Sequence, residues 1–216
     1  MLTATFFRFV CATRIDRGEA VLFRSYEPPD DAEPSEFTNV DITSAACATS
    51  AAPTFLPAVE IQKVKFWDGG LLNNNPIDQV WDARYDVAPE LLSDDKASPE
   101  PDIALVLSIG TGYHMETAKL PTSVVETLGA TVAYATNTKA KDVDFRRNMK
   151  RMNRRKPVNQ RTEYFRFDTP IKESINIDDW QRMPELAEAT TAWLDCVGAT
   201  EVDKCVELLA NIISPP

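Results

Sequence analysis

Four of the seven glycines in this chain stand just after segments that are predicted to be strands. The pair Gly69-Gly70 follows a strand that ends near Asp68, and the turn Gly110-Thr111-Gly112 follows the apolar run Ile103–Leu107. Glycine lets the backbone turn sharply and lets another chain or a ligand approach closely. Strands that end in this way are typical of open α/β sheets, which bind ligands at the carboxyl ends of their strands.

The residue pattern predicts strands that alternate with helices. β-Branched, aromatic or alternating apolar residues predict strands at Thr5–Thr13, Val21–Phe23, Val59–Phe66, Ile103–Leu107 and Tyr164–Phe167. The first two should form a hairpin. Helices are expected at Ile42–Ala52 with Asp41 as N-cap, after Asn75 as N-cap with Pro76 in the first turn, and over residues 178–216. This order predicts an α/β fold with a layered, mostly parallel sheet and flanking helices, in one partial domain over residues 1–216.

Composition excludes several classes of protein. The chain has 23 basic and 33 acidic residues, a net charge of −10, and 44% hydrophobic residues, which is ordinary for a globular protein. No run approaches the roughly 20 apolar residues of a membrane-spanning helix, and Leu2–Val10 lacks the features of a secretory signal. With a single histidine, His114, and four cysteines but no Cys-x-x-Cys pair, the chain lacks the ligands of zinc-finger and His-rich sites, so we expect no structural metal. A cytoplasmic location with reduced thiols is expected.

Positive charge is concentrated in the segment Lys139–Arg166, which has 11 basic and 3 acidic residues and therefore a net charge of +8. Such a segment could make peripheral contact with anionic phospholipid headgroups or with an acidic protein surface. It could equally be a solvated helical face followed by a loop. Nucleic acid is not the expected partner, because the chain as a whole is acidic.

Asp68 is the candidate catalytic residue. It ends a strand, and its aromatic neighbours Phe66 and Trp67 should lower the local polarity and make the carboxylate a stronger base. Aspartate with its ordinary pKa of about 3.9 is a weak base at neutral pH, so an enzyme that uses one needs such surroundings. The alternative is a turn, because Asp-Gly-Gly after a strand is common in turns.

The block from Ala48 to Pro76 strongly resembles the patatin-like phospholipase family, in which an Ala-Thr-Ser-Ala-Ala-Pro-type helix precedes a strand that ends in Asp-Gly-Gly and then Asn-Asn-Pro. The resemblance implies a Ser-Asp dyad in which Asp68 is the proton acceptor. It also implies supporting roles for Gly69, Gly70, Asn74 and Pro76. A looser resemblance continues through Gly110-Thr111-Gly112 to the strand Tyr164–Phe167.

The chain lacks two elements of that family, namely a Gly-x-Ser-x-Gly nucleophile elbow and the glycine-rich loop that forms an oxyanion hole. The resemblance therefore implies the C-terminal half of a patatin-like domain, belonging to a serine acyl hydrolase of phospholipids or other acyl lipids. A patatin-derived module that binds lipid or protein without catalysis is the alternative, and nucleotide binding at Gly110-Thr111-Gly112 is a weaker one. His114 is expected in a surface loop, and Ser50 in the interior of a helix, where serine usually bonds to the preceding turn.

Overall fold

The structure is a computed structural model. It describes residues 7–27, 36–86, 103–114, 138–173, 175–176 and 178–213. Residues 5–6 of the first predicted strand and residues 214–216 of the predicted C-terminal helices lie outside these ranges. The chain divides into two compact units, one of residues 1–101 and 121–141 and the other of residues 102–120 and 142–216. Each unit is described by itself.

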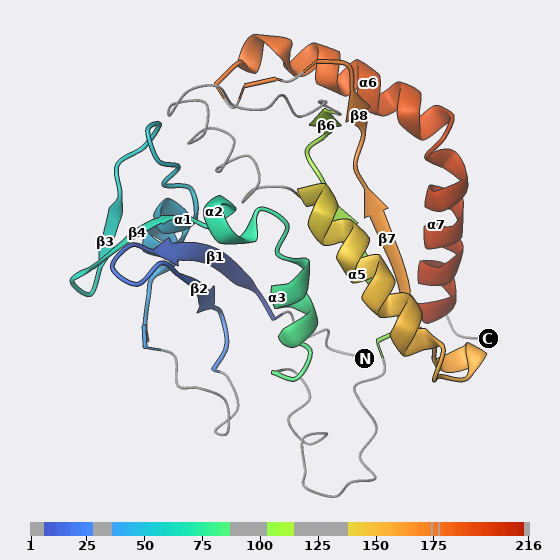
Figure 1. Cartoon of the computed structure of the whole chain (residues 1–216), viewed down its shortest axis with the longest axis horizontal. Helices are drawn as coiled ribbons and strands as arrows, with labels where there is room; N and C mark the ends of the chain where they lie inside the picture. Colours follow the sequence, from blue (N-terminus) through green and yellow to red (C-terminus); the bar gives the residue numbers. More distant parts are fainter. Residues whose placement is uncertain are drawn as a thin grey trace, which may run out of the picture. The chain divides into compact units, whose positions relative to one another are not determined.

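The first unit is built on a four-stranded sheet with the order β2-β1-β4-β3 (Figure 1). Its strands are β1 (Phe9–Arg14), β2 (Glu19–Arg24), β3 (Val59–Ile61) and β4 (Val64–Asp68). All three pairings are antiparallel. The predicted hairpin of the first two strands is confirmed, with Gly18 at a φ of 65° in its turn.

The prediction of one continuous strand over Val59–Phe66 is wrong, because this segment is a hairpin. Ile61 lies directly opposite Val64, so Gln62 and Lys63 alone form the turn. Their φ values of 50° and 69° are positive, as in the type I′ turns that match the twist of paired strands. The two adjacent polar residues interrupt the apolar alternation, and that interruption marks the turn.

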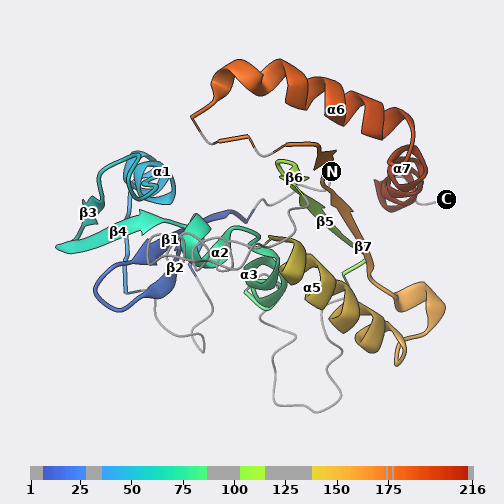
Figure 2. The ribbon, with the colours of Figure 1, turned by 45° about the horizontal axis from the view of Figure 1, so that its top comes forward.

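Three phenylalanines from different segments form the centre of the core in the first unit. Phe66 of β4 is fully buried, and its ring lies 5.3 Å from that of Phe23 and 5.1 Å from that of Phe37, edge to face. Ala48 packs against them from the helix α1 (Ile42–Thr49), which contacts β1, β3 and β4 (Figure 2). The small side chains of this alanine-rich helix let it lie close to the sheet.

The boundaries of α1 follow the predicted start but not the predicted end. Asp41 caps the helix as expected, because its carboxylate accepts a hydrogen bond from the Ser44 N–H at 2.9 Å. The helix ends at Thr49 rather than Ala52, and Ser50 is its C-cap. The prediction of Ser50 as a helix-interior residue is therefore wrong.

Two short helices follow β4, namely α2 (Gly70–Asn73) and α3 (Ile77–Asp82). The N-cap of α3 is Pro76, so the predicted cap at Asn75 is wrong by one position. Asn75 is buried and uses its side-chain amide elsewhere, donating to the Thr138 carbonyl at 3.3 Å. A contact with a residue so distant in sequence cannot be read from the local pattern.

The second unit contains two pairs of parallel strands. β5 (Leu105–Ile109) pairs with β7 (Glu163–Phe167), and β6 (Tyr113–His114) pairs with β8 (Pro170–Ile171). The helix α5 (Thr138–Asn153) begins in the first unit and continues in the second, where it packs against β7 through Phe145 and Tyr164, whose ring centroids are 4.8 Å apart.

The C-terminal helices are confirmed as α6 (Met183–Asp195) and α7 (Ala199–Ile213), preceded by the short helix η3 (Trp180–Arg182). Trp193 of α6 lies edge to face against Phe167 of β7, with the ring centroids 6.4 Å apart. In Figures 1 and 2, α5 lies on one side of the β5–β7 pair and α7 on the other. Within the described ranges, no helix is both long and apolar enough to cross a bilayer.

The mixture of helices and strands confirms the α/β prediction. The described strands do not form the layered, mostly parallel sheet that the pattern predicts. The four-stranded sheet is antiparallel in all its pairings, and among the described strands only β5 with β7 and β6 with β8 pair in parallel. Val59–Phe66 folds back on itself, and β4 then pairs with β1 in the opposite direction.

We expect the substitution Phe66→Ala to lower the free energy of unfolding by about 3–5 kcal/mol, because it removes a fully buried ring from between two others. A guanidinium unfolding curve followed by circular dichroism measures this change. Lys65→Ala, at the adjacent exposed position of β4, should change it by less than about 0.5 kcal/mol. Equal effects of the two substitutions would contradict this description of the core.

The substitution Lys63→Gly should stabilise the first unit by roughly 0.5 kcal/mol, because glycine adopts the positive φ of this turn without steric cost. Lys63→Val should destabilise it, since a branched side chain is least tolerated at such a φ. The same unfolding measurement tests both variants. If Lys63→Val were the more stable, residues 62 and 63 would not form this turn.

Candidate functional site

Asp68 is the last residue of β4, at the end of the strand as the sequence predicts. Its position is fixed through its main chain. The Asp68 N–H donates to the Ala51 carbonyl at 3.0 Å, and its carbonyl accepts a hydrogen bond from the Thr13 hydroxyl at 2.8 Å. These two hydrogen bonds fix the backbone of Asp68 and do not involve its carboxylate.

A side chain at either of the two positions after Asp68 would collide with a neighbouring group, and the neighbour differs between the two. A Cβ at position 69 would lie only 2.4 Å from the carbonyl oxygen of Cys11, because β1 crosses at that point. A Cβ at position 70 would lie 2.9 Å from the carboxylate of Asp68 itself. Gly69 therefore allows the strands to meet, whereas Gly70 leaves one side of the carboxylate uncovered.

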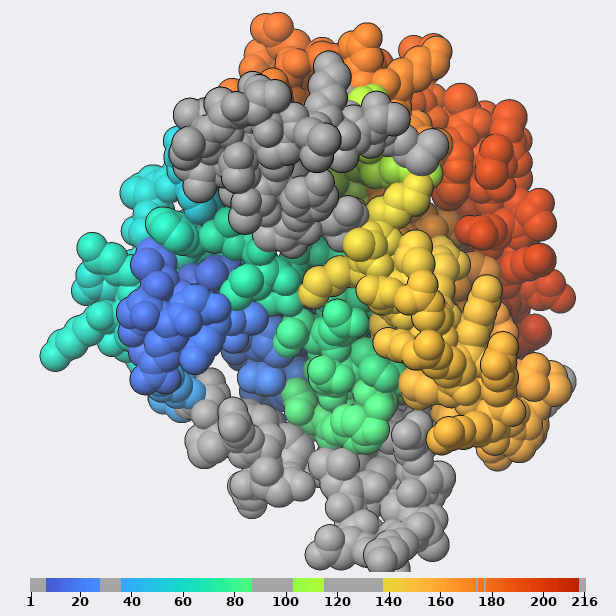
Figure 3. Space-filling model, in the orientation of Figure 1, coloured from blue at the N-terminus to red at the C-terminus, as the bar shows by residue number. Residues whose placement is uncertain are grey.

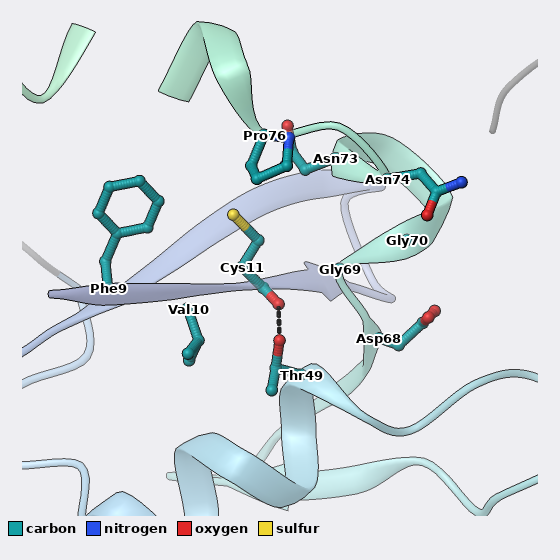
Figure 4. Close-up of a pocket in the computed structure, with 10 residues that line it drawn as sticks. All are labelled: Phe9, Val10, Cys11, Thr49, Asp68, Gly69, Gly70, Asn73, Asn74 and Pro76. Carbon is teal, nitrogen blue, oxygen red and sulfur yellow. Dashed lines mark hydrogen bonds between the residues drawn. The ribbon is translucent and has the colours of Figure 1, made fainter. Parts of the chain in front are cut away.

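A pocket of about 380 Å³ opens beside this turn (Figure 4). That volume is within the range of small-molecule sites. Residues from β1, α1, the end of β4 and the segment after it line the pocket: Phe9, Val10, Cys11, Thr49, Asp68, Gly69, Gly70, Asn73, Asn74 and Pro76. In Figure 4 the Asp68 carboxylate lies on the Asn74 side, and the Cys11 thiol points toward Asn73 and Pro76.

All the predicted site residues, namely Asp68, Gly69, Gly70, Asn74 and Pro76, meet at this pocket. The sequence interpretation missed Cys11, Thr49 and Asn73. Thr49 belongs to the Ala-Thr-Ser block, and its hydroxyl donates to the Cys11 carbonyl at 2.7 Å, so the motif itself was the available signal. Cys11 reaches the pocket only because β1 pairs with β4, which no local pattern reveals.

Burial raises the pKa of Asp68 above its ordinary value, and a hydrogen bond from the Gly70 N–H opposes that increase only in part. Among the described residues, no ion pair involves Asp68. A carboxylate that is partly desolvated and not neutralised by a cation binds a proton more readily than a solvated one. The sequence predicts this direction from the aromatic neighbours of Asp68.

Cys11 is the only thiol that lines the pocket, and its environment makes it a poor nucleophile. Burial raises the pKa of Cys11 to about 11, and the charges of Arg24 and Lys141 lower it only in part. The reactive form of cysteine is the thiolate, which is scarce at neutral pH when the pKa is this high. Cys11 therefore does not replace a nucleophilic serine.

His114 is not the surface-loop residue that the sequence predicts. It lies half-buried in β6, where it pairs with Ile171 of β8 in the second unit. Ser50 also does not line the pocket that contains Asp68. Neither residue is among those that line this pocket.

The turn Gly110-Thr111-Gly112 is occupied by a side chain of the protein. The Gly112 N–H donates to the Asp168 carboxylate at 3.0 Å, and a Cβ at Gly110 would lie 2.2 Å from that carboxylate. Asp168 in turn binds Arg166 at 2.6 Å. Nucleotide phosphates bind such loops through backbone N–H groups, and here a carboxylate already accepts the Gly112 N–H.

Comparison with known families agrees with this geometry. A family model described as patatin-like phospholipase matches residues 2–81, a range that includes β1, α1 and the segment from Asp68 to Pro76. None of the curated proteins matches the chain. The match ends before Gly110-Thr111-Gly112, where the resemblance in sequence is weak. The resemblance to the patatin-like phospholipase family, a family of lipid acyl hydrolases, is thus confirmed, and residues 2–81 are the part of the chain that carries it.

Proposed function

We propose that Asp68 is the proton acceptor of a Ser-Asp dyad in a patatin-like acyl hydrolase that cleaves ester bonds of phospholipids or related acyl lipids. The observation that carries this proposal is the half-buried carboxylate at the pocket, with a raised pKa and no cation paired with it among the described residues. A structural turn aspartate would gain from solvation or from a cation. Gly70 leaves room beside the carboxylate for a reacting group.

The reaction follows from these roles. A serine hydroxyl attacks the ester carbonyl carbon while its proton passes to the Asp68 carboxylate. Collapse of the tetrahedral intermediate breaks the ester C–O bond, and the departing alcohol takes the proton back. Water then repeats the sequence on the acyl-enzyme, and the fatty acid leaves. Under this proposal the serine comes from polypeptide outside the 216 residues, because no serine here lies in a Gly-x-Ser-x-Gly elbow.

The pocket suits an acyl ester. Phe9 and Pro76 supply apolar surface, while Asp68 and Asn74 supply polar groups on the other side. Neither a metal nor an organic cofactor has a role in the chemistry proposed. The proposal also places the protein in the cytoplasm, with peripheral membrane contact through the basic segment Lys139–Arg166.

The substitution Asp68→Asn should stabilise the chain at pH 7, and the gain should shrink as the pH falls toward 4. The raised pKa means that folding favours the protonated acid. The protonated acid therefore adds to the stability of the folded chain when the pH is below the ordinary pKa of aspartate. This contribution to stability is lost as the pH rises through the raised pKa that Asp68 has in the folded state. Asparagine resembles the neutral acid at every pH. Melting temperatures of both proteins from pH 4 to 8 measure the difference, and a destabilised variant at pH 7 would identify Asp68 as a turn residue.

The purified 216-residue chain should not hydrolyse a p-nitrophenyl acyl ester, because the nucleophile elbow and the oxyanion donors are absent from its sequence. When the chain is joined to a segment that supplies both, Asp68→Asn should lower turnover at least about a hundredfold, since the dyad loses its base. Asp68→Glu should also fail, because the longer side chain displaces the carboxylate.

The substitution His114→Ala is the control for that experiment and should leave turnover almost unchanged. Two outcomes would contradict the proposal. If the chain alone is active and Asp68→Asn abolishes that activity, the nucleophile lies within these residues. If the joined protein loses activity with His114→Ala but keeps it with Asp68→Asn, the dyad assignment is wrong.

A further inference from the structure

The structure divides the basic segment into two parts with different surroundings. In the first part, three of the basic residues lie beside carboxylates. Arg146 binds Asp142 at 3.0 Å, and Arg147 binds Asp144 at 2.8 Å. Lys141 lies 3.5 Å from Asp78. Arg166, at the other end of the segment, is buried against Asp168 and Ser108, so it offers no charge to a partner.

The second part, which we call the basic tip, is residues 150–161 at the end of α5 and in the turn after it. It contains six basic residues and no acidic residue: Lys150, Arg151, Arg154, Arg155, Lys156 and Arg161. All except the half-buried Lys156 are exposed. Within the described ranges, none of the six forms an ion pair. In Figure 3 this part of the chain is coloured yellow to orange and lies on the face turned toward the viewer.

Helix stability explains only part of this arrangement. Lys150 and Arg151 stand in the last turn of α5, where cations favourably face the negative end of the helix dipole. Arg154, Arg155 and Arg161 lie beyond the helix and gain little from it. The Arg154 N–H donates to the Lys150 carbonyl, so these two like charges follow each other around the last turn with no acidic side chain between them, and they repel each other. An anionic surface would relieve that repulsion.

An exposed apolar residue stands in the middle of the basic tip. Val158 begins the short helix η2 (Val158–Gln160) and is 77% exposed, directly after Pro157. Basic residues around an exposed apolar side chain are the combination by which peripheral proteins bind a bilayer, since the charges meet the headgroups and the apolar group enters the interface. The tip has no aromatic side chain on which a nucleic-acid base could stack.

We infer that the basic tip, with Val158, is the surface through which this protein binds anionic phospholipid membranes. The choice of a lipid membrane as the partner rests on the proposed function, because an acyl-lipid hydrolase must reach its substrate at a lipid surface. It also narrows the predicted contact from Lys139–Arg166 to residues 150–161. The remainder of the chain carries a net charge of −10 − 6 = −16, so attraction to an anionic bilayer depends on this tip.

The test is co-sedimentation of the 216-residue chain with vesicles of phosphatidylcholine alone or with 30 mol% phosphatidylserine. We expect binding only to the anionic vesicles, and weaker binding at 0.5 M than at 0.1 M NaCl. The double variant Arg154→Glu/Arg155→Glu should bind at least about tenfold more weakly. Val158→Ser should weaken binding less, and should do so even at high salt. Circular dichroism checks that each variant is folded.

The matched control is Lys172→Glu/Lys204→Glu, which makes the same charge change at exposed positions of the same unit and should leave binding almost unchanged. Equal losses in the two double variants would overturn the inference, because net charge would then suffice. Absence of binding to anionic vesicles would overturn it as well, as would tighter binding to a duplex RNA at the same salt. This experiment measures binding and not turnover. Its outcome therefore does not test the role of Asp68, which the turnover experiment tests separately.

Discussion

The site depends on the close crossing of β1 and β4 at Gly69. Ala12 lies opposite Asp68 in this antiparallel pair, and Gly69, the first residue after β4, passes so near the Cys11 carbonyl that only a glycine fits. Without this contact, the end of β4 would separate from β1, and the pocket would lose one wall. Gly69 therefore does more than form a turn after Asp68. It is needed because β1, which is distant in sequence, packs against this position.

The same crossing explains why threonines surround the site. The Thr49 hydroxyl satisfies the Cys11 carbonyl, and the Thr13 hydroxyl satisfies the Asp68 carbonyl. Both carbonyls are at the end of the β1–β4 pairing, where the strand ladder no longer supplies donors. A partly buried carbonyl without a donor costs free energy comparable to a lost hydrogen bond. Side-chain hydroxyls from β1 and α1 thus keep the strand end rigid, so that the Asp68 carboxylate is held at the pocket.

Local signals in the sequence predicted local structure well. Asp41 caps α1, the β1–β2 hairpin forms, and Asp68 ends its strand, because each depends on neighbours within a few residues. The predictions that failed depend on distant contacts. Asn75 uses its amide on Thr138, and the antiparallel β1–β4 pair joins segments about 55 residues apart, so neither the cap nor the direction of pairing was visible locally. The pocket could be anticipated at Asp68, and Thr49 lies in the same motif, but the wall that Cys11 forms could not be anticipated.

Two aspartates with similar local sequence show what the fold adds. Asp68 follows the aromatic Trp67 at the end of β4, and Asp168 follows the aromatic Phe167 at the end of β7. Asp168 is bound by Arg166 and by the Gly112 N–H, so its charge is neutralised and its oxygens are occupied. The Asp68 carboxylate has the Gly70 N–H but no ion pair in the described part of the chain, and burial raises its pKa. A charge that is desolvated without compensation is unfavourable for stability. The contrast with Asp168 supports the proposed role of Asp68 as a proton acceptor.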